Sequence, residues 1–132
     1  MSKSLIQTVN PTTQAVAVNG IISLGSVLRR FGCNCRLSGN AIELSGCGYY
    51  KVDAAVTVEP TAIGDTAVAL YADGVQIPAA IGSGNAAAAG DPVTVPITTT
   101  VRLREDGTTS LTFVLTEGAG NVTNISARVE KA

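Results

Sequence analysis

The cysteines are the residues of this chain whose type and spacing are best suited to chemistry. Cys33 and Cys35 are separated by a single residue, and Cys47 follows in a later segment. On one strand, Cys33 and Cys35 would point to the same face, where Cys47 could join them to hold a metal ion or to carry out redox chemistry. Zinc sites of the usual type place about two to four residues between paired cysteines. The spacing and the odd number therefore favour three small buried thiols that fill a gap in the core, with no metal and no disulfide.

Residues that could supply a general base or a pair of acids are missing or badly placed. The chain has no histidine, which removes Ser-His-Asp and Cys-His catalysis and the commonest zinc ligand. Asp53 and Glu59 share one side of an expected strand, but at about 3.3 Å per residue they lie about 20 Å apart, too far for the carboxylates of a glycosidase. Gly82 and Gly84 lack the lysine and helix start of a phosphate-binding loop. We therefore predict a protein that is not an enzyme and needs no cofactor.

Aspartates and asparagines in expected turns offer two weaker signals. Asp65, Asp73 and Asp91 could bind calcium, although aspartates in turns more often accept hydrogen bonds from their own backbone. The sequence leaves calcium binding open and predicts no metal site. Asn121 and Asn124 each begin a glycosylation motif, which we interpret as chance in a chain without a secretory signal.

Charge and hydropathy exclude several classes of partner. Nine basic residues stand against ten acidic ones, the net charge is −1, and no block of like charge occurs. A nucleic-acid binder would carry a basic stripe, and a peripheral membrane protein a polybasic segment. No apolar run is long enough to span a bilayer, and the first residues lack the apolar stretch of a signal peptide. We therefore expect synthesis in a cytosol, no nucleic-acid partner and no membrane insertion.

Alanine makes up much of the apolar content, which is 45% of the chain, and residues 86–89 are a run of it. Alanine buries little area, and the hydrophobic gain scales at roughly 25 cal/mol per Å². We therefore expect the core of one subunit to be thin, so that burial between subunits would be a natural supplement.

Segments that alternate between apolar and polar residues recur along the chain, bounded by Gly, Pro, Asn and Asp, and helical periodicity is nearly absent. The pattern predicts one all-β domain over residues 13–132, an antiparallel sandwich of about eight to ten strands, preceded by an extended N-terminal arm at 1–12. A jelly roll and an immunoglobulin-like sandwich both fit, and the lack of tryptophan favours the jelly roll. The expected strands cover residues 14–18, 21–27, 29–37, 41–44, 49–59, 66–72, 75–81, 92–104, 111–115 and 123–129, with a loop at 82–91.

The long expected strand at residues 49–59 shows which face belongs to the core, because its first face is almost purely aliphatic and its second is polar. Strand 92–104 alternates in the same way, and Thr123 is expected to begin the inward face of the last strand. The residues expected to face the core from strand 49–59 are Tyr50, Val52, Ala54, Val56 and Val58.

The stretch at 48–52 (GYYKV) and the alternating strand after it resemble a signature of the tumour-necrosis-factor-like jelly rolls, in particular the globular heads of the complement recognition subcomponent. The hairpin at 68–75, with its Asp-Gly turn, is similar to the next unit of that family, and order and spacing match over residues 14–130. Val52 departs from the pattern, because an aromatic residue is usual there, and no collagen-like repeat is present. Compact phage structural proteins and bacterial spore-surface heads are similar as well.

The resemblance implies a homotrimer packed around a threefold axis through one sheet, to which strands 49–59, 92–104 and 123–129 belong. Small side chains would let subunits approach closely there, and opposite charges could pair between them. The alternative is an ordinary solvated face. The residues of the implied trimer interface are Tyr49, Lys51, Asp53, Ala55, Thr57, Thr94, Thr98, Thr100, Arg102, Asn124, Ser126, Arg128 and Glu130.

Together these expectations predict a homotrimeric virion structural protein, a phage head decoration or head-fibre subunit that docks on the capsid. The N-terminal arm, with Leu5, Ile6, Val9 and Pro11, is predicted to attach it by adding a strand to the partner, three copies acting together. The alternative is a receptor-binding tip of a phage fibre or a spore-surface head. A sugar-binding tip would need exposed aromatic residues, and several of those in this chain are expected to be buried.

Overall fold

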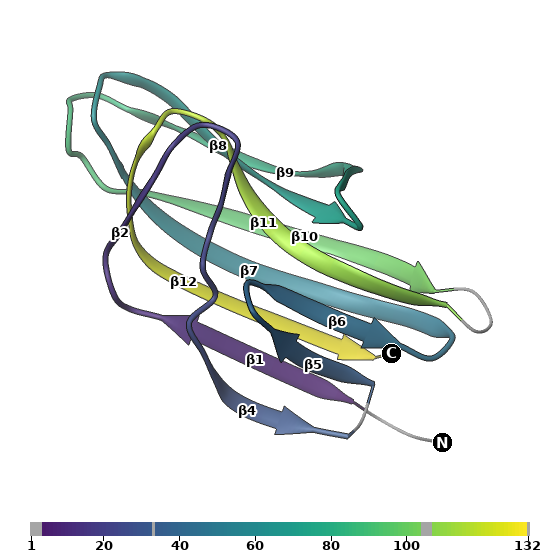
Figure 1. Ribbon diagram of the computed structural model, residues 1–132. Coiled ribbons are helices and arrows are strands. Elements are labelled where there is room, and N and C mark those ends of the chain that lie inside the picture. The colour runs from purple at the N-terminus through teal and green to yellow at the C-terminus, as the bar shows by residue number, and fades with distance from the viewer. Residues whose placement is uncertain (1–3, 33, 104–106, 132) are drawn as a thin grey trace.

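The computed structural model of the chain describes residues 4–32, 34–103 and 107–131, which form strands joined by turns and loops, with no helix in those ranges (Figure 1). Those ranges therefore contain no helix that is long and apolar enough to cross a membrane. The strands are β1 (Leu5–Asn10), β2 (Gln14–Val16), β3 (Gly20–Ile21), β4 (Ser26–Phe31), β5 (Cys35–Ser38), β6 (Ala41–Ser45), β7 (Gly48–Pro60), β8 (Gly64–Ala72), β9 (Val75–Ala86), β10 (Val93–Leu103), β11 (Thr108–Glu117) and β12 (Gly120–Lys131).

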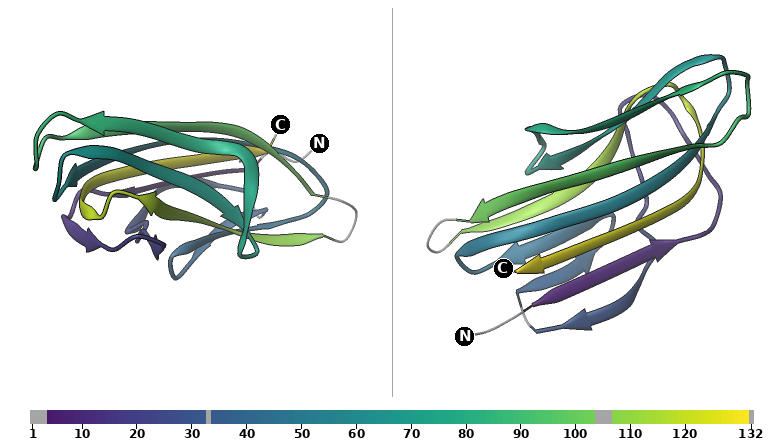
Figure 2. Two further views of the ribbon diagram at one scale, coloured as in Figure 1. Left: turned by 90° about the horizontal axis from the view of Figure 1, so that it is seen from above. Right: turned by 180° about the vertical axis from the view of Figure 1, so that it is seen from behind.

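Two antiparallel sheets face each other, as the view from above shows (Figure 2). Sheet A has the strand order β10-β7-β12-β1-β4, with β2 beside β12. Sheet B has the order β5-β6-β11-β8-β9, with β3 beside β11. This confirms the predicted all-β jelly-roll sandwich. The described residues form twelve strands, more than expected, because the predicted arm contains β1 and the segment expected as two strands between 21 and 37 contributes to three.

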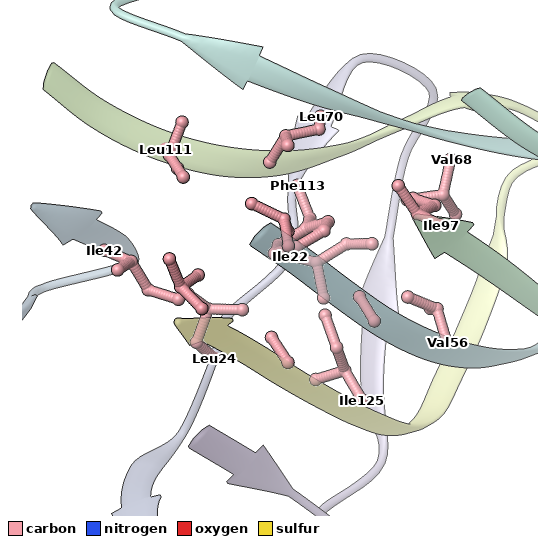
Figure 3. Packing of buried hydrophobic residues seen from close by; sticks show 14 of the residues in the cluster. Ile22, Leu24, Ile42, Val56, Val68, Leu70, Ile97, Leu111, Phe113 and Ile125 are labelled. Atoms are coloured by element: carbon pink, nitrogen blue, oxygen red, sulfur yellow. The ribbon is translucent and has the colours of Figure 1, made fainter. Parts of the chain in front are cut away.

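Side chains from the inner faces of both sheets meet in one core, where Ile22, Leu70 and Phe113 of one layer lie opposite Val56 and Ile125 of the other (Figure 3). Burial of each such side chain contributes roughly 1.5–3 kcal/mol. Valine, leucine and isoleucine dominate this core. In the run at 86–89 the first alanine is buried and the next three are exposed, so most of this run lies outside the core and the apolar percentage overstates its size.

Strand β7 follows the predicted alternation along its length. The expected core residues Tyr50, Val52, Ala54, Val56 and Val58 are all buried. The Tyr50 hydroxyl donates to the carbonyl oxygens of Ser45 and Gly46, each at 2.8 Å, so this large side chain fills the core with its polar end satisfied.

The N-terminal segment is part of the sheet and not an arm. Strand β1 pairs with β12 on one side and with β4 on the other. Ile6 is completely buried, and Thr8 nearly so. The predicted domain boundary after residue 12 and the free docking arm are therefore wrong for residues 5–10. The segment was interpreted as an arm because its apolar residues Leu5, Ile6 and Val9 are too few to form a core of their own. In the structure, Ile6 joins a core that other strands supply.

The expected strand 29–37 is wrong as a single element. Strand β4 ends at Phe31, Gly32 has a positive φ of 81°, and β5 begins at Cys35 in the other sheet. Glycine adopts that left-handed conformation without a steric penalty, so the chain can turn there and cross from sheet A to sheet B. Earlier in the chain, β3 ends at Ile21 and β4 begins at Ser26, so the expected strand 21–27 is also divided.

Strand β9 continues to Ala86, so the loop expected at 82–91 is wrong for its first half. A Cβ atom added at Gly82 would collide with the backbone oxygen of Pro96 and with Val95, and one added at Gly84 would collide with Val93. The glycines therefore allow β9 of sheet B to approach β10 of sheet A closely. A glycine-rich sequence reads as a loop, and this long-range contact is not visible in it.

Candidate functional site

The outer face of sheet A is the surface on which the predicted interface residues gather. Strands β10, β7 and β12 are neighbours in this sheet, as the resemblance implied. All thirteen predicted residues are exposed or half-buried, on strand positions that alternate with the buried ones. We call this surface the A face; its members are Tyr49, Lys51, Asp53, Ala55, Thr57, Thr94, Thr98, Thr100, Arg102, Asn124, Ser126, Arg128 and Glu130.

The register orders these residues in rows across the three strands. In one row Asp53 lies between Thr98 of β10 and Arg128 of β12. The row on one side of it has Lys51 between Thr100 and Glu130, and the row on the other side is uncharged. Directly opposed side chains in an antiparallel pair have Cβ atoms about 4.5–5.5 Å apart. Opposite charges therefore face each other across β7 and β12 twice in succession.

The closest of these charge pairs joins Asp53 and Arg128, whose Oδ2 and guanidinium nitrogen are 3.6 Å apart with both side chains about half exposed. An exposed pair of this kind stabilises a free subunit by about 0–1 kcal/mol. The same two residues, with Ala55, Thr98 and Ser126, line a shallow hollow of about 310 Å³ in the middle of the A face. The centre of the face is thus slightly concave and carries balanced charge.

Two further contacts define the ends of the A face. At one end the Arg102 guanidinium lies 5.7 Å from the centre of the Tyr49 ring, a distance at which a cation is attracted to an aromatic face. At the other end the hydroxyl oxygens of Thr57 and Thr94 are 3.2 Å apart. Of the aromatic residues, Tyr50 and Phe113 are buried, whereas Tyr49 and Phe31 are exposed.

A bulge in β12 changes the side that one predicted residue faces. The register with β7 shifts between Val122 and Asn124. Val122 is therefore the buried residue, and Thr123 is half-buried with its hydroxyl donating to the carbonyl oxygen of Thr57 at 3.4 Å. The expectation that Thr123 begins the inward face is wrong, but the alternation is restored by Asn124, which lies on the A face as predicted.

The N-terminal residues extend the A face, which sequence reasoning missed. Leu5 pairs with Glu130, and Val9 pairs with Ser126, so both side chains lie on this surface. Pro11 is exposed in the segment after β1. These residues can be placed on the A face only if β1 is known to pair with β12. The two strands lie near opposite ends of the sequence, so no local pattern predicts that pairing.

The cysteines do not form the expected buried trio. Cys35 is buried in β5, Cys47 is exposed in the turn before β7, and Cys33 lies outside the described residues. Burial raises the pKa of the Cys35 thiol to about 11, and the nearby Arg30 and Lys131 cations offset part of that rise. Cys35 is therefore a neutral thiol at pH 7 and a poor nucleophile or metal ligand. The described residues contain no group of three His, Cys, Asp or Glu side chains that could hold a metal ion.

Two of the three aspartates considered as calcium ligands, Asp73 and Asp65, accept hydrogen bonds from protein donors. The Asp73 carboxylate accepts from the Thr109 hydroxyl at 2.8 Å and from the Ser110 amide at 3.0 Å. Asp65 accepts from the Asn85 side chain at 2.8 Å and lies inside β8, not in a turn as expected. Their oxygen atoms serve the local structure.

A second concavity, of about 410 Å³, lies beside β6 and β11, and it could not be predicted from the sequence because its residues come from five separate segments. Its charged groups are already engaged: Arg36 Nε donates to Glu43 Oε2 at 2.8 Å, and Arg30 Nε donates to the Cys35 carbonyl at 2.9 Å. The residues that line it are Arg30, Arg36, Glu43, Leu44, Ser45, Asp73, Thr108, Thr109 and Ser110.

Comparison with known proteins assigns the class of fold. No protein-family model matches the sequence. No curated protein matches it either. Among solved structures, Eiger TNF from S. frugiperda is similar with a TM-score of 0.72 and 8% identity, over 98% of this chain and 91% of that one.

Two further structures agree on that class. The globular domain of the zebrafish complement 1qA protein is similar with a TM-score of 0.70 and 8% identity, over 94% of each chain. PRD1 vertex protein P5 is similar with a TM-score of 0.59 and 11% identity, over 97% of this chain and 96% of that one. The chain therefore has a tumour-necrosis-factor-like jelly-roll fold, as its residues at 48–52 indicated.

Proposed function

We propose that this chain is a structural subunit that forms a homotrimer through the A face, and that it binds other proteins and does not catalyse a reaction. The observation that carries the proposal is the composition of that face, where hydroxyl and alanine side chains surround two pairs of opposite charge. The tumour-necrosis-factor-like fold supports it, because the family resemblance implies a trimer through this sheet.

Small side chains suit such an interface for a physical reason. Alanine and proline lose no rotamer freedom on burial, and serine and threonine lose little, so covering them costs less than covering long side chains. Ala55 has Pro96 on one side and Ser126 on the other, so only short side chains project from the middle of the A face. A second subunit can approach this part of the sheet closely.

The charged pairs would give the interface its specificity. In a free subunit the Asp53–Arg128 pair is half exposed and screened by water. A neighbouring subunit would lower the local dielectric, which strengthens matched charges and penalises mismatched ones. The net charge of −1 does not oppose self-association.

The finer proposal is that the trimer belongs to a virion, as a phage head decoration or head-fibre subunit docked on a capsid after synthesis in a bacterial cytoplasm. The fold likeness to a protein named as the PRD1 vertex protein supports a virion role.

Placing a large charge in the middle of the A face tests the trimer. Ala55→Arg should abolish assembly, because Ala55 is exposed and its replacement would project a cation toward the neighbouring subunit. Ser83→Arg, at an exposed position on β9 of sheet B, is the matched control. In sedimentation velocity we expect Ala55→Arg to run as a folded monomer and Ser83→Arg as the wild type. Equal sedimentation of both variants would exclude the A face as the interface.

The virion role has a separate test. A mass-spectrometric inventory of purified phage particles should contain this chain at a copy number divisible by three, and the purified protein should co-sediment with particles that lack it. Binding to bacterial envelopes with no binding to particles would instead support the receptor-binding alternative.

A further inference from the structure

Strand β4 is an edge strand of sheet A whose outer side has no neighbour among the described residues (Figures 1 and 2). Its one pairing partner is β1. In the part of the chain that the structure describes, no backbone or side-chain hydrogen bond outside that pairing reaches the β4 backbone. Alternate N–H and C=O groups of an edge strand point away from its neighbour, so β4 presents a row of backbone groups to the exterior.

The side chains of this edge are unusual for a protected one. All six residues of β4 are exposed, and among them Val27, Leu28 and Phe31 are 39%, 54% and 63% exposed. Charged side chains and β-bulges both hinder pairing at a sheet edge, and β4 has both, since its register with β1 shifts where Leu28 is inserted. The large apolar side chains beside the arginines are the feature that a protected edge would lack, and they favour recognition of a partner strand.

The charge of the edge is positive. Arg29 and Arg30 are both exposed, and no carboxylate among the described residues lies within ion-pair distance of either. Arg29 is in register with Gln7, which is in register with Arg128, but Arg128 is paired with Asp53, so Arg29 is the described cation of this row that has no carboxylate within ion-pair distance. This end of sheet A would attract acidic side chains.

We propose that the open edge of β4 is a docking site for an extended, acidic segment of a partner protein, which adds to sheet A as a further strand. The backbone groups of β4 would supply the hydrogen bonds, Arg29 the selectivity for acidic residues, and Leu28 and Phe31 the apolar contact, whereas Arg30 is engaged with the Cys35 carbonyl. A second copy of β4 fits poorly, because antiparallel pairing would bring two pairs of arginines together and like charges opposed across strands are destabilising.

The proposal goes beyond the trimer and does not depend on it. Strand β1 separates β4 from β12, the nearest strand of the predicted trimer interface. The A face over β10, β7 and β12 and the β4 edge can therefore be occupied at the same time. In a trimer, three such edges would multiply a weak contact through effective concentration.

The test uses the full chain and two blocked synthetic octapeptides, one alternating valine with glutamate and the other valine with lysine. Hydrogen exchange should show protection of the β4 amides by the acidic peptide, and fluorescence anisotropy should give an affinity at least tenfold above that of the basic one. Arg29→Glu should lower the affinity for the acidic peptide at least tenfold. Ser83→Glu, which introduces a carboxylate at an exposed position on β9 of sheet B, should leave that affinity within twofold.

The proposal would be overturned by equal binding of both peptides or by no binding of the acidic one. Equal losses of affinity with Arg29→Glu and Ser83→Glu, or protection confined to residues outside β4, would overturn it as well. Binding to vesicles of phosphatidylserine and phosphatidylcholine without binding of the acidic peptide would also overturn it, since the basic and apolar edge would then be a membrane contact.

Discussion

The two edges of sheet A are built in opposite ways. At β10 the sandwich is closed, because Gly82 and Gly84 let β9 of the other sheet lie against Val93, Val95 and Pro96. At β4 the sandwich is open, and every residue of the strand is exposed. The difference shows that the close approach of the two sheets at β10 depends on the absence of side chains at Gly82 and Gly84. It also shows that an edge can stay open when arginines and apolar residues share it.

Removing β1 should have the largest effect on stability, because β1 is the strand that joins the edge strand β4 to the rest of sheet A. Deletion of residues 2–10 takes away the partner of both β12 and β4, together with the buried side chain of Ile6. We expect the chain to lose its cooperative thermal unfolding transition, measured by circular dichroism. Phe31→Ala, on the exposed side of β4, is the control and should change the free energy of unfolding by less than about 0.5 kcal/mol. A deletion variant as stable as the wild type would restore the interpretation of this segment as an arm.

A single methyl group tests the closed edge. Gly82→Ala places a Cβ against the backbone oxygen of Pro96, which cannot move without moving β10. Overpacking of this kind costs about 1–3 kcal/mol, so the midpoint of urea unfolding should fall. Ser83→Ala, at the exposed neighbouring position, should stay within about 0.5 kcal/mol of the wild type. If both variants unfold at the same urea concentration, the close approach of β9 to β10 does not hold in solution.

The smallest expected effect concerns Cys35, which lies in β5 close to the open edge. Burial raises the pKa of its thiol in the folded protein from 9.0 to about 11. The stability that the neutral thiol contributes is therefore fully present below pH 9 and is lost as the pH rises toward 11. Over that range the free energy of unfolding of the wild type should fall more steeply than that of Cys35→Ala. Parallel curves for the two proteins would show that the thiol is not buried in the folded state.

Much of this architecture could be predicted from the sequence, because strands buried on one face carry a local signal. The alternation in residues 49–59 and 92–104 correctly assigned the inward faces of β7 and β10. The same alternation assigned the residues of the A face. Their shared location also depended on the family resemblance, since nothing in the spacing alone states that β10, β7 and β12 are neighbours.

The errors occurred where a long-range contact decides the structure. Residues 5–10 form a strand because β12 and β4 lie on either side of them, and residues 82–86 do so because β10 lies against their glycines. The bulge at Thr123 was also invisible, since one inserted residue reverses the side that a position faces without changing the composition. The open edge of β4 was missed for a related reason. Apolar residues in a strand suggest burial, but those of β4 are exposed because no further described strand pairs with it.

The trimer is the central claim, and the molar mass of the wild-type protein in solution tests it most directly. Light scattering coupled to size-exclusion chromatography at micromolar concentration should give three times the chain mass of 13.4 kDa. A mass equal to that of one chain at the same concentration would contradict the account.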